Sequence, residues 1–377
     1  MAMKGYSLEH IRKYTMLIAL VAIWLLFTVF TDGVFISPRN LSNLFVQTVA
    51  VGIIAIGMTL VIITRNIDLS VGSVAAFVGA LAAFLQVKMG WPTSFAIAVA
   101  LVGGLGIGFW HGFWIAYRMV PAFIVTLASM MIFRGAVLGI TEGTTIAPLS
   151  QAFRAIGQRY LSPHLSIVVG ALAVIAYAFA HFYKRKRRTG YGFKVTPLPL
   201  DILKALLISL VIASFFGIMV HNRGISYAVL LMLLLAVIFN FISQQTVFGR
   251  QLYAIGGNPD AAELSGVNIK KRIMTLFVVF GGITAVSGLV LTARLNAATT
   301  SAGQGMELDV IAATVIGGTS LMGGEGTIFG ALVGALIMAS LDNGMSLMNT
   351  NITYQYIIKG MILLLAVWVD IATRKKA

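Results

Sequence analysis

Twelve apolar stretches constrain the fold of this 377-residue chain more than any other feature. A helix of about 20 apolar residues crosses a bilayer, and in lipid only helices and closed barrels satisfy the backbone. The stretches therefore predict an all-α polytopic transmembrane bundle of about 10–12 membrane segments. They cover roughly residues 15–31, 44–64, 70–87, 93–116, 121–140, 164–182, 202–220, 225–243, 273–292, 309–322, 326–345 and 353–370.

One of these stretches, 309–322, is short and interrupted by glycine. We expect it to be a half-helix or a re-entrant segment rather than a full span. It lies within 303–326, which is rich in glycine and polar side chains. Irregular backbone at membrane depth is tolerated only where it is buried in protein or lines water. This region is therefore a candidate part of a transport pathway.

The composition excludes several classes of protein. With 59% hydrophobic and 10% charged residues, the chain is not a soluble domain. The absence of cysteine excludes disulfides and thiolate metal sites. The sequence lacks a phosphate-binding loop, an H-E-x-x-H zinc motif and a G-x-S-x-G elbow, and its five histidines lack metal-ligand spacing. We therefore predict no catalytic, cofactor-binding or metal-binding residues and no ATP hydrolysis by this chain.

Basic residues predict the orientation in the membrane. With the N-terminus inside, the inner gaps hold 18 of the 27 Lys and Arg residues and the outer gaps hold 6. This bias places both termini in the cytoplasm, together with the loop 244–272 and the basic run 184–188. The net charge of +15 then reflects basic loops beside anionic lipid, and no nucleic-acid partner is expected.

A short helix is predicted in the loop 244–272. Asn258 can cap its first amides, and Pro259 fits the first helical position. Asp260 and Glu263 place negative charge at the positive end of the helix dipole, and Gly266 supplies a left-handed end. Ala261 and Ala262 make one side small and smooth. From these residues alone two interpretations stay open: a helix that docks against another protein, or a solvated loop helix without a partner.

Several polar residues fall inside or beside the apolar segments, where they are costly unless partnered or hydrated. Asp68 or Ser70 can cap the next helix or mark a helix break near the substrate path, and the two roles are compatible. Arg134 either snorkels outward or faces a hydrated interior, towards Glu142, and Lys359 is expected to snorkel. The candidates for the pathway or for helix breaks are Asp68, Ser70, Arg134, Glu307, Asp309, Thr319, Ser320, Asp342 and Asn343.

Two sets of glycines repeat at a spacing of four residues, which places each set on one helix face. Such faces let a second helix pack closely in lipid. The sets are Gly104, Gly108 and Gly112, and Gly326, Gly330 and Gly334.

Five stretches of the chain resemble a known family, the membrane permease subunits of bacterial ABC importers for monosaccharides, which serve ribose, galactosides and xylose. They are NIDLSVGS at 66–73, VPAFIVTLASMMIFRGAVLGITEGTT at 120–145, FGRQLYAIGGNPDAAELSGVNI at 248–269, ELDVIAATVIGGTSLMGGEG at 307–326 and SLDNGMSLM at 340–348. These stretches are distributed from about residue 35 to the C-terminus, so the resemblance covers most of the chain.

The resemblance implies an inner-membrane protein with several partners. Two permease copies would form the pathway for a monosaccharide. Two cytoplasmic ATPase domains, which carry ATP-Mg, would bind below, and a periplasmic sugar-binding protein would deliver substrate from above. The loop around 250–266 is similar to the helix that couples such permeases to their ATPase. The residues expected in this coupling are Arg250, Asn258, Ala261, Ala262, Glu263, Ser265 and Gly266.

The chain departs from the ribose-type pattern at about 160–222, where two further apolar segments and the basic run are inserted. This longer form looks most like D-xylose permeases. We therefore expect one membrane domain, with a core at 15–160 and 225–370 and a coupling loop at 244–272. A secondary, ion-coupled sugar carrier is the alternative, and it would need buried titratable relays. A membrane enzyme acting on lipid-linked sugars would need clustered acids, for which only Glu307 and Asp309 are candidates.

Overall fold

The computed structural model describes residues 4–193 and 195–374, and within them the backbone is almost entirely helical. Each of the twelve predicted apolar segments contains a helix. These are α1 (Lys4–Phe30), α2 (Pro38–Ile63), α3 (Val71–Ala83), α4 (Thr93–Gly112), α5 (Ala122–Thr141), α7 (Pro163–Gly190), α8 (Leu198–Asn222), α9 (Tyr227–Gln245), α12 (Ile269–Leu295), α13 (Met306–Ile316), α14 (Ile328–Leu347) and α15 (Ile352–Arg374). Short π-helical turns, Phe84–Lys88 and Phe113–Tyr117, extend α3 and α4.

The predicted polytopic helical bundle is confirmed. Among the residues described, nine helices are long and apolar enough to cross a membrane, and the apolar parts of α1 and α15 are shorter. By contrast, α13 has 11 residues and is therefore only about 16 Å long, roughly half of the bilayer core. A non-helical loop, 317–327, follows it. The short glycine-interrupted segment is thus half a span.

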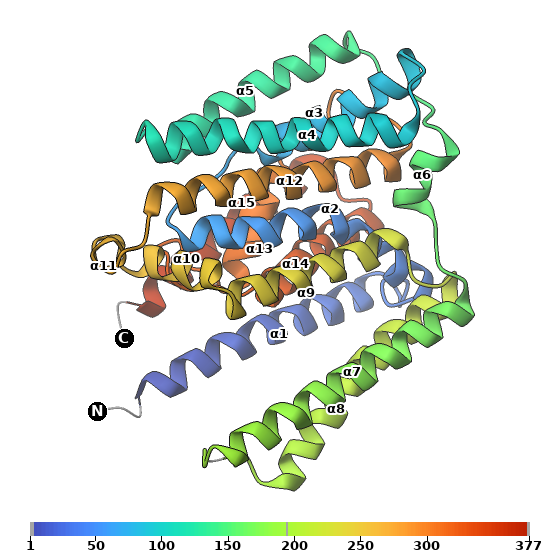
Figure 1. Cartoon of the computed structure of the whole chain (residues 1–377). Helices are drawn as coiled ribbons and strands as arrows, with labels where there is room; N and C mark the ends of the chain where they lie inside the picture. The colour runs from blue at the N-terminus through green and yellow to red at the C-terminus, as the bar shows by residue number, and fades with distance from the viewer. Residues whose placement is uncertain (1–3, 194, 375–377) are drawn as a thin grey trace.

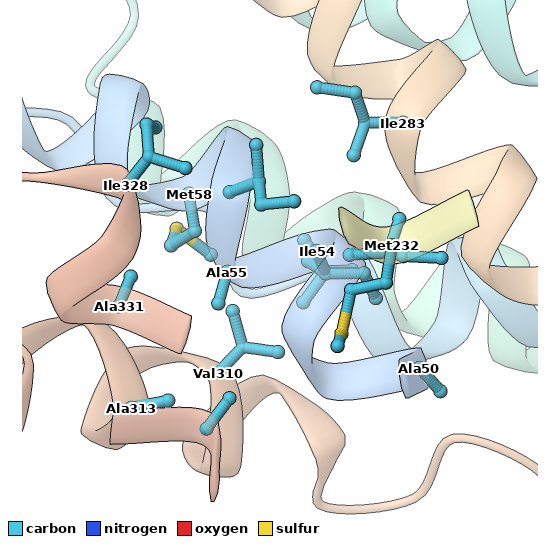
Figure 2. Packing of buried hydrophobic residues seen from close by; sticks show 14 of the residues in the cluster. Ala50, Ile54, Ala55, Met58, Met232, Ile283, Val310, Ala313, Ile328 and Ala331 are labelled. Carbon is cyan, nitrogen blue, oxygen red and sulfur yellow. The ribbon is translucent and has the colours of Figure 1, made fainter. Parts of the chain in front are cut away.

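Helix α2 lies at the centre of the bundle, and 89% of its most apolar 18-residue stretch is buried. It contacts α9, α12, α13 and α14. Figure 2 shows this packing: Ala50, Ile54, Ala55 and Met58 of α2 lie among Met232, Ile283, Val310, Ala313, Ile328 and Ala331. Small residues on α2, α13 and α14 allow the close approach that replaces a hydrophobic driving force in lipid.

The first glycine set lies against α12. A Cβ at Gly104, Gly108 or Gly112 would collide with α12, at Ala285, the Phe277 carbonyl and Met274 respectively. In the second set, Gly330 and Gly334 lie against Gly317 and Ala313, so they join α14 to α13 and its loop. Gly326 does not belong to this face, because it precedes α14 and instead lies beside Thr319.

The two inserted helices, α7 and α8, form a hairpin at one edge of the bundle, and α4 and α5 lie at the other (Figure 1). Only 11% of the most apolar 18-residue stretch of α7 and 17% of that of α8 are buried. Most of the surface of these two helices is therefore available for contact with lipid. An ion pair between Arg185 and Asp201 joins the two helices, and Arg185 also donates to the Thr196 carbonyl at 2.8 Å.

The two ends of the bundle differ in what they carry (Figure 1). The start of α1, the end of α15, the α7–α8 turn and two short helices, α10 (Val247–Gly257) and α11 (Pro259–Leu264), lie toward one end, which we call the α11 end. Helix α6 (Gln151–Gln158) lies at the opposite, α6 end. The predicted loop 244–272 is therefore mostly helical, although only α11 was expected. That the α11 end faces the cytoplasm stays a prediction from the basic residues.

Candidate functional site

Helix α11 forms as its local sequence predicts. The Asn258 side chain accepts a hydrogen bond from the Ala261 amide at 3.0 Å, and Pro259 is the first helical residue. The Ser265 hydroxyl donates to the Ala261 carbonyl at 2.8 Å. Gly266 adopts φ = 83°, the left-handed conformation that glycine takes without strain. These contacts are local, and they give a short, rigid helix with a defined exit.

The outward face of α11 differs from the expected one. Ala262 is only 5% exposed and belongs to the core of this chain, so it is not part of an alanine docking face. Ala261 and Glu263 are exposed, and Leu264 beside them is 91% exposed. Sequence reasoning missed Leu264. The sequence could have identified Leu264, because it is the one large apolar side chain between Asn258 and Gly266. Leu264 is therefore the exposed apolar side chain that α11 offers for contact with a partner protein.

Three hydrogen bonds tie α10 to the rest of the bundle. Arg65 donates to the carbonyls of Gly256 and Gly257, each at 2.7 Å, at the C-terminal end of α10. Tyr253 donates to the Gly326 carbonyl at 2.7 Å. Burial raises the pKa of the Tyr253 hydroxyl, so it stays protonated as this donor.

A fourth hydrogen bond completes this junction. The Gly324 amide donates to the carbonyl of Ile63, the last residue of α2, at 2.9 Å. Helix α10, which leads directly into α11, is thus linked both to the end of α2 and to the loop that follows α13. Arg65 itself has φ = 63°, which is uncommon for a residue with a side chain and indicates that these contacts hold it in place.

The break between α2 and α3 is built around Asp68, which is 2% exposed. Its Oδ1 accepts from the Ser70 amide at 2.7 Å and from the Ser70 hydroxyl at 2.6 Å. Its Oδ2 lies 3.5 Å from Nδ1 of His111, at the end of α4. Neither Asp68 nor Ser70 caps α3, because the Ser70 side chain makes no cap bond and Asp68 binds the amide of Ser70 itself. The histidine partner was missed, since nothing in the sequence pairs the two positions.

Arg134 holds the loop that precedes α13. It donates to the Ala302 carbonyl at 2.9 Å and to the Thr300 carbonyl at 3.4 Å. The expected orientation towards Glu142 is wrong, because Glu142 ends α5 in a left-handed conformation and is exposed. The carboxylate of Glu307 lies beside Gly72 of α3. Arg134 therefore stabilises the irregular backbone through which the chain enters the half-span.

Lys359 does not snorkel to the membrane surface. Its ammonium lies 3.0 Å from Oδ2 of Asp309 and 2.8 Å from Oδ1 of Asp342. The three residues come from α15, α13 and α14. A charge inside the membrane is costly unless it is paired, so the two carboxylates keep the Lys359 ammonium within the bundle.

A cavity of about 200 Å³ opens beside the triad, far above the 10–15 Å³ that one water needs. Its polar lining consists of Gln47, Arg294, Asp309 and Asp342. A second hollow shares Asp309 with it and is lined by Lys359, Gln355 and Tyr356 among others. Asn343, next to Asp342, donates to Gln47 at 3.3 Å and exchanges hydrogen bonds with Asn40, which fixes α14 against α2.

The predicted pathway residues thus fall into separate groups. Asp309, Asp342 and Asn343 gather at the cavity. Thr319 and Ser320 are buried in the loop at the α11 end, where the Ser320 hydroxyl accepts from the Met322 amide at 3.1 Å. Asp68 and Ser70 form the helix break, and Arg134 and Glu307 flank the entry to α13. Gln47 and Arg294 line the cavity and Lys359 lines the adjoining hollow, and the sequence singled out none of the three for a pathway.

This fold and these sites define a multi-pass membrane permease. The family described as "Branched-chain amino acid transport system / permease component" matches residues 40–367. The chain belongs to this family of ABC importer permeases, and it is a multi-pass protein of the bacterial inner membrane. The predicted resemblance is confirmed.

Curated relatives narrow the similarity further. The chain is 47% identical to the xylose transport system permease protein XylH of Haemophilus influenzae, over 97% of this chain and 98% of that one. It is 46% identical to XylH of Escherichia coli, over 99% and 95%. The ribose import permease protein RbsC of Haemophilus influenzae is 35% identical over 97% and 94%. No solved structure matches the chain.

Proposed function

We propose that this chain is the permease subunit of an importer for D-xylose. The observation that carries this proposal is near full-length similarity to two permeases named for xylose transport, at 46–47% identity, against 35% for a ribose permease. The chain would form the membrane pathway, work as a homodimer and hydrolyse no ATP. A separate cytoplasmic ATPase would bind ATP-Mg, and a periplasmic binding protein would deliver the sugar.

The geometry of the α11 end supports this division of labour. An ATPase needs a rigid element on which to act and a connection from that element to the pathway. Helix α11 supplies a self-capped element with Leu264 and Glu263 exposed. The preceding helix, α10, is joined by the Arg65 and Tyr253 hydrogen bonds to the end of α2 and to the loop after α13. Movement of α11 would therefore be transmitted to the helices that surround the cavity.

An ion-coupled secondary carrier is the second candidate, and one observation favours it. The triad of Lys359, Asp309 and Asp342 is a titratable cluster at membrane depth, which is what proton-coupled carriers use. The proposed importer gives the triad a different role, as an ion-paired part of a sugar pathway. The family description also names branched-chain amino acids, so substrate class is part of the test.

Reconstitution separates these functions. The permease, the ATPase and the binding protein are placed in lipid vesicles, and uptake of radiolabelled xylose, ribose and leucine is measured. We expect xylose uptake that requires ATP, the ATPase and the binding protein together. Xylose accumulation by the permease alone in response to a proton gradient would instead establish a secondary carrier. Uptake of leucine in preference to xylose would contradict the sugar assignment.

A further inference from the structure

The cavity beside the triad has a composition that is unusual for the interior of a membrane protein. Its lining combines donors, acceptors and apolar side chains: Gln47 from α2, Arg294 from α12, Asp309 from α13, and Met338, Ala339 and Asp342 from α14. Polar groups cluster at membrane depth mainly where they meet a substrate or each other. Since these residues and Val51 come from four different helices, the cavity is a product of the tertiary fold.

The formal charge of the cluster is balanced. Arg294 and Lys359 are cationic, and Asp309 and Asp342 are anionic, with Lys359 held between the two carboxylates. A balanced cluster exerts little net attraction on an ion of either sign. The cavity is therefore suited to a neutral ligand that carries many hydrogen-bonding groups.

Donors in the cavity are left without partners. The Arg294 guanidinium donates no hydrogen bond to any residue in the described ranges, and neither does the Nε2 amide of Gln47, whose Oε1 accepts from Asn343. Both side chains are half-buried, so their unused N–H groups can donate to a ligand oxygen in the cavity. The carboxylates of Asp309 and Asp342 offer acceptors in the same lining.

The cavity also lies near one end of the bundle. Arg294 is at the last turn of α12, and its carbonyl accepts from Gln158 of α6 at 2.9 Å. The cavity is thus close to the α6 end, which faces the periplasm in the predicted orientation. A molecule released at that face would reach this cavity before the α11 end.

We propose that this cavity is a sugar-binding station, in which Arg294 and Gln47 donate to sugar oxygens and Asp309 and Asp342 accept from sugar hydroxyls. The Lys359 ammonium lies outside this lining and bridges one oxygen of each carboxylate. The inference rests on the proposed sugar-permease function and assigns that function a specific site. It also implies rejection of acidic sugars, because an added carboxylate would face Asp309 and Asp342.

The native chain has no cysteine, so a single introduced thiol reports directly on the cavity. Ala339→Cys places it in the lining, and Met338→Cys is an alternative if the first variant does not assemble. Ser346→Cys is the matched control, since it is exposed on the same helix and outside the cavity. The complete importer in lipid vesicles is treated with a small methanethiosulfonate reagent, and the rate of labelling is measured with and without xylose.

We expect xylose to slow labelling at residue 339 and to leave residue 346 unaffected. D-glucuronate, whose ring has the hydroxyl arrangement of xylopyranose plus a carboxylate, should not protect. In the Ala339→Cys background, Arg294→Met and Gln47→Leu should each raise the xylose concentration that halves labelling by about tenfold, the value for loss of one buried hydrogen bond to a charged or amide donor.

Other outcomes overturn the proposal. If xylose leaves labelling of residue 339 unchanged while the same vesicles transport xylose, the triad is only a structural link and the importer function stands. Failure of residue 339 to react in any stage of transport also overturns it, because a cavity that admits a pentose admits the reagent. If the native complex transports no xylose, the proposed function itself is contradicted.

Discussion

At the scale of single residues, the buried charges are the informative positions. Asp68 uses one oxygen to hold Ser70 and the other to face His111, so it fixes both the α2–α3 break and the end of α4. A role limited to helix capping would make Asp68→Asn mild, since asparagine caps about as well. The observed geometry predicts a larger effect, because the amide of asparagine changes the group that faces His111.

We expect Asp68→Asn to lower the free energy of unfolding by roughly 1–3 kcal/mol, as for a buried polar group that loses its partner. Thermal unfolding of the purified permease and xylose uptake measure the effect. Asp32→Asn is the control, because Asp32 is exposed and surface substitutions usually change stability by less than about 0.5 kcal/mol. His111→Gln should partly restore the Asp68→Asn variant. Wild-type uptake by Asp68→Ala at normal expression would refute any role for this carboxylate.

At the scale of elements, α11 and its junction separate docking from transmission. Leu264 and Glu263 face outward, whereas Arg65 lies behind α11 and holds the end of α10. Leu264→Asp should detach the ATPase, because a charge replaces the apolar contact. Co-purification of the ATPase and its stimulation by the binding protein measure this. Full stimulation by Leu264→Asp in a complex of normal stoichiometry would show that α11 is not the docking element.

Arg65→Met should leave the ATPase bound and stimulated, but it removes two hydrogen bonds from a charged donor. Each is worth roughly 1.5–3 kcal/mol, so we expect the xylose transported per ATP hydrolysed to fall by about tenfold or more. Arg65→Lys retains one donor and should be intermediate. Equal coupling ratios in Arg65→Met and the native complex would mean that this junction carries no movement.

Ala262→Trp is a poor test of docking, because Ala262 is buried and the variant would disturb packing.

At the scale of the whole molecule, the glycine faces are used inside the chain. Gly104, Gly108 and Gly112 pack on α12, and Gly330 and Gly334 pack on α13 and its loop. A second copy would therefore dock on other surfaces. Mass measurement of the intact complex tests the proposed homodimer: we expect two permease copies per pair of ATPase domains, and a single copy would contradict it.

The orientation is tested with the same cysteine-free background. Thr189→Cys lies at the α7–α8 turn and Gln151→Cys lies on α6, at opposite ends of the bundle, and both positions are exposed. In intact cells, a membrane-impermeant thiol reagent should label residue 151 and not residue 189, since the basic run predicts that the turn is cytoplasmic. Labelling of residue 189 from outside would reverse the topology and with it the direction assigned to the cavity.

The sequence by itself determined the features that depend on neighbouring residues or on the solvent. Lipid requires long apolar helices, so the twelve helical segments and the half-span at α13 were predictable from length alone. The caps of α11 were predictable because Asn258 and Gly266 act within one turn. The motifs spread along the chain were sufficient to predict which family the protein belongs to.

Only the tertiary structure decided which polar residues meet. Lys359 reaches Asp309 across a separation of 50 residues, and Asp68 faces His111 on another helix. Neither pair has a sequence signal, because a charge in an apolar segment can snorkel, pair or face water, and the choice depends on which helix lies opposite. The burial of Ala262 and the exposure of Leu264 follow the same rule: α11 is too short for a periodic pattern, so its packing against the bundle determines the face that it presents.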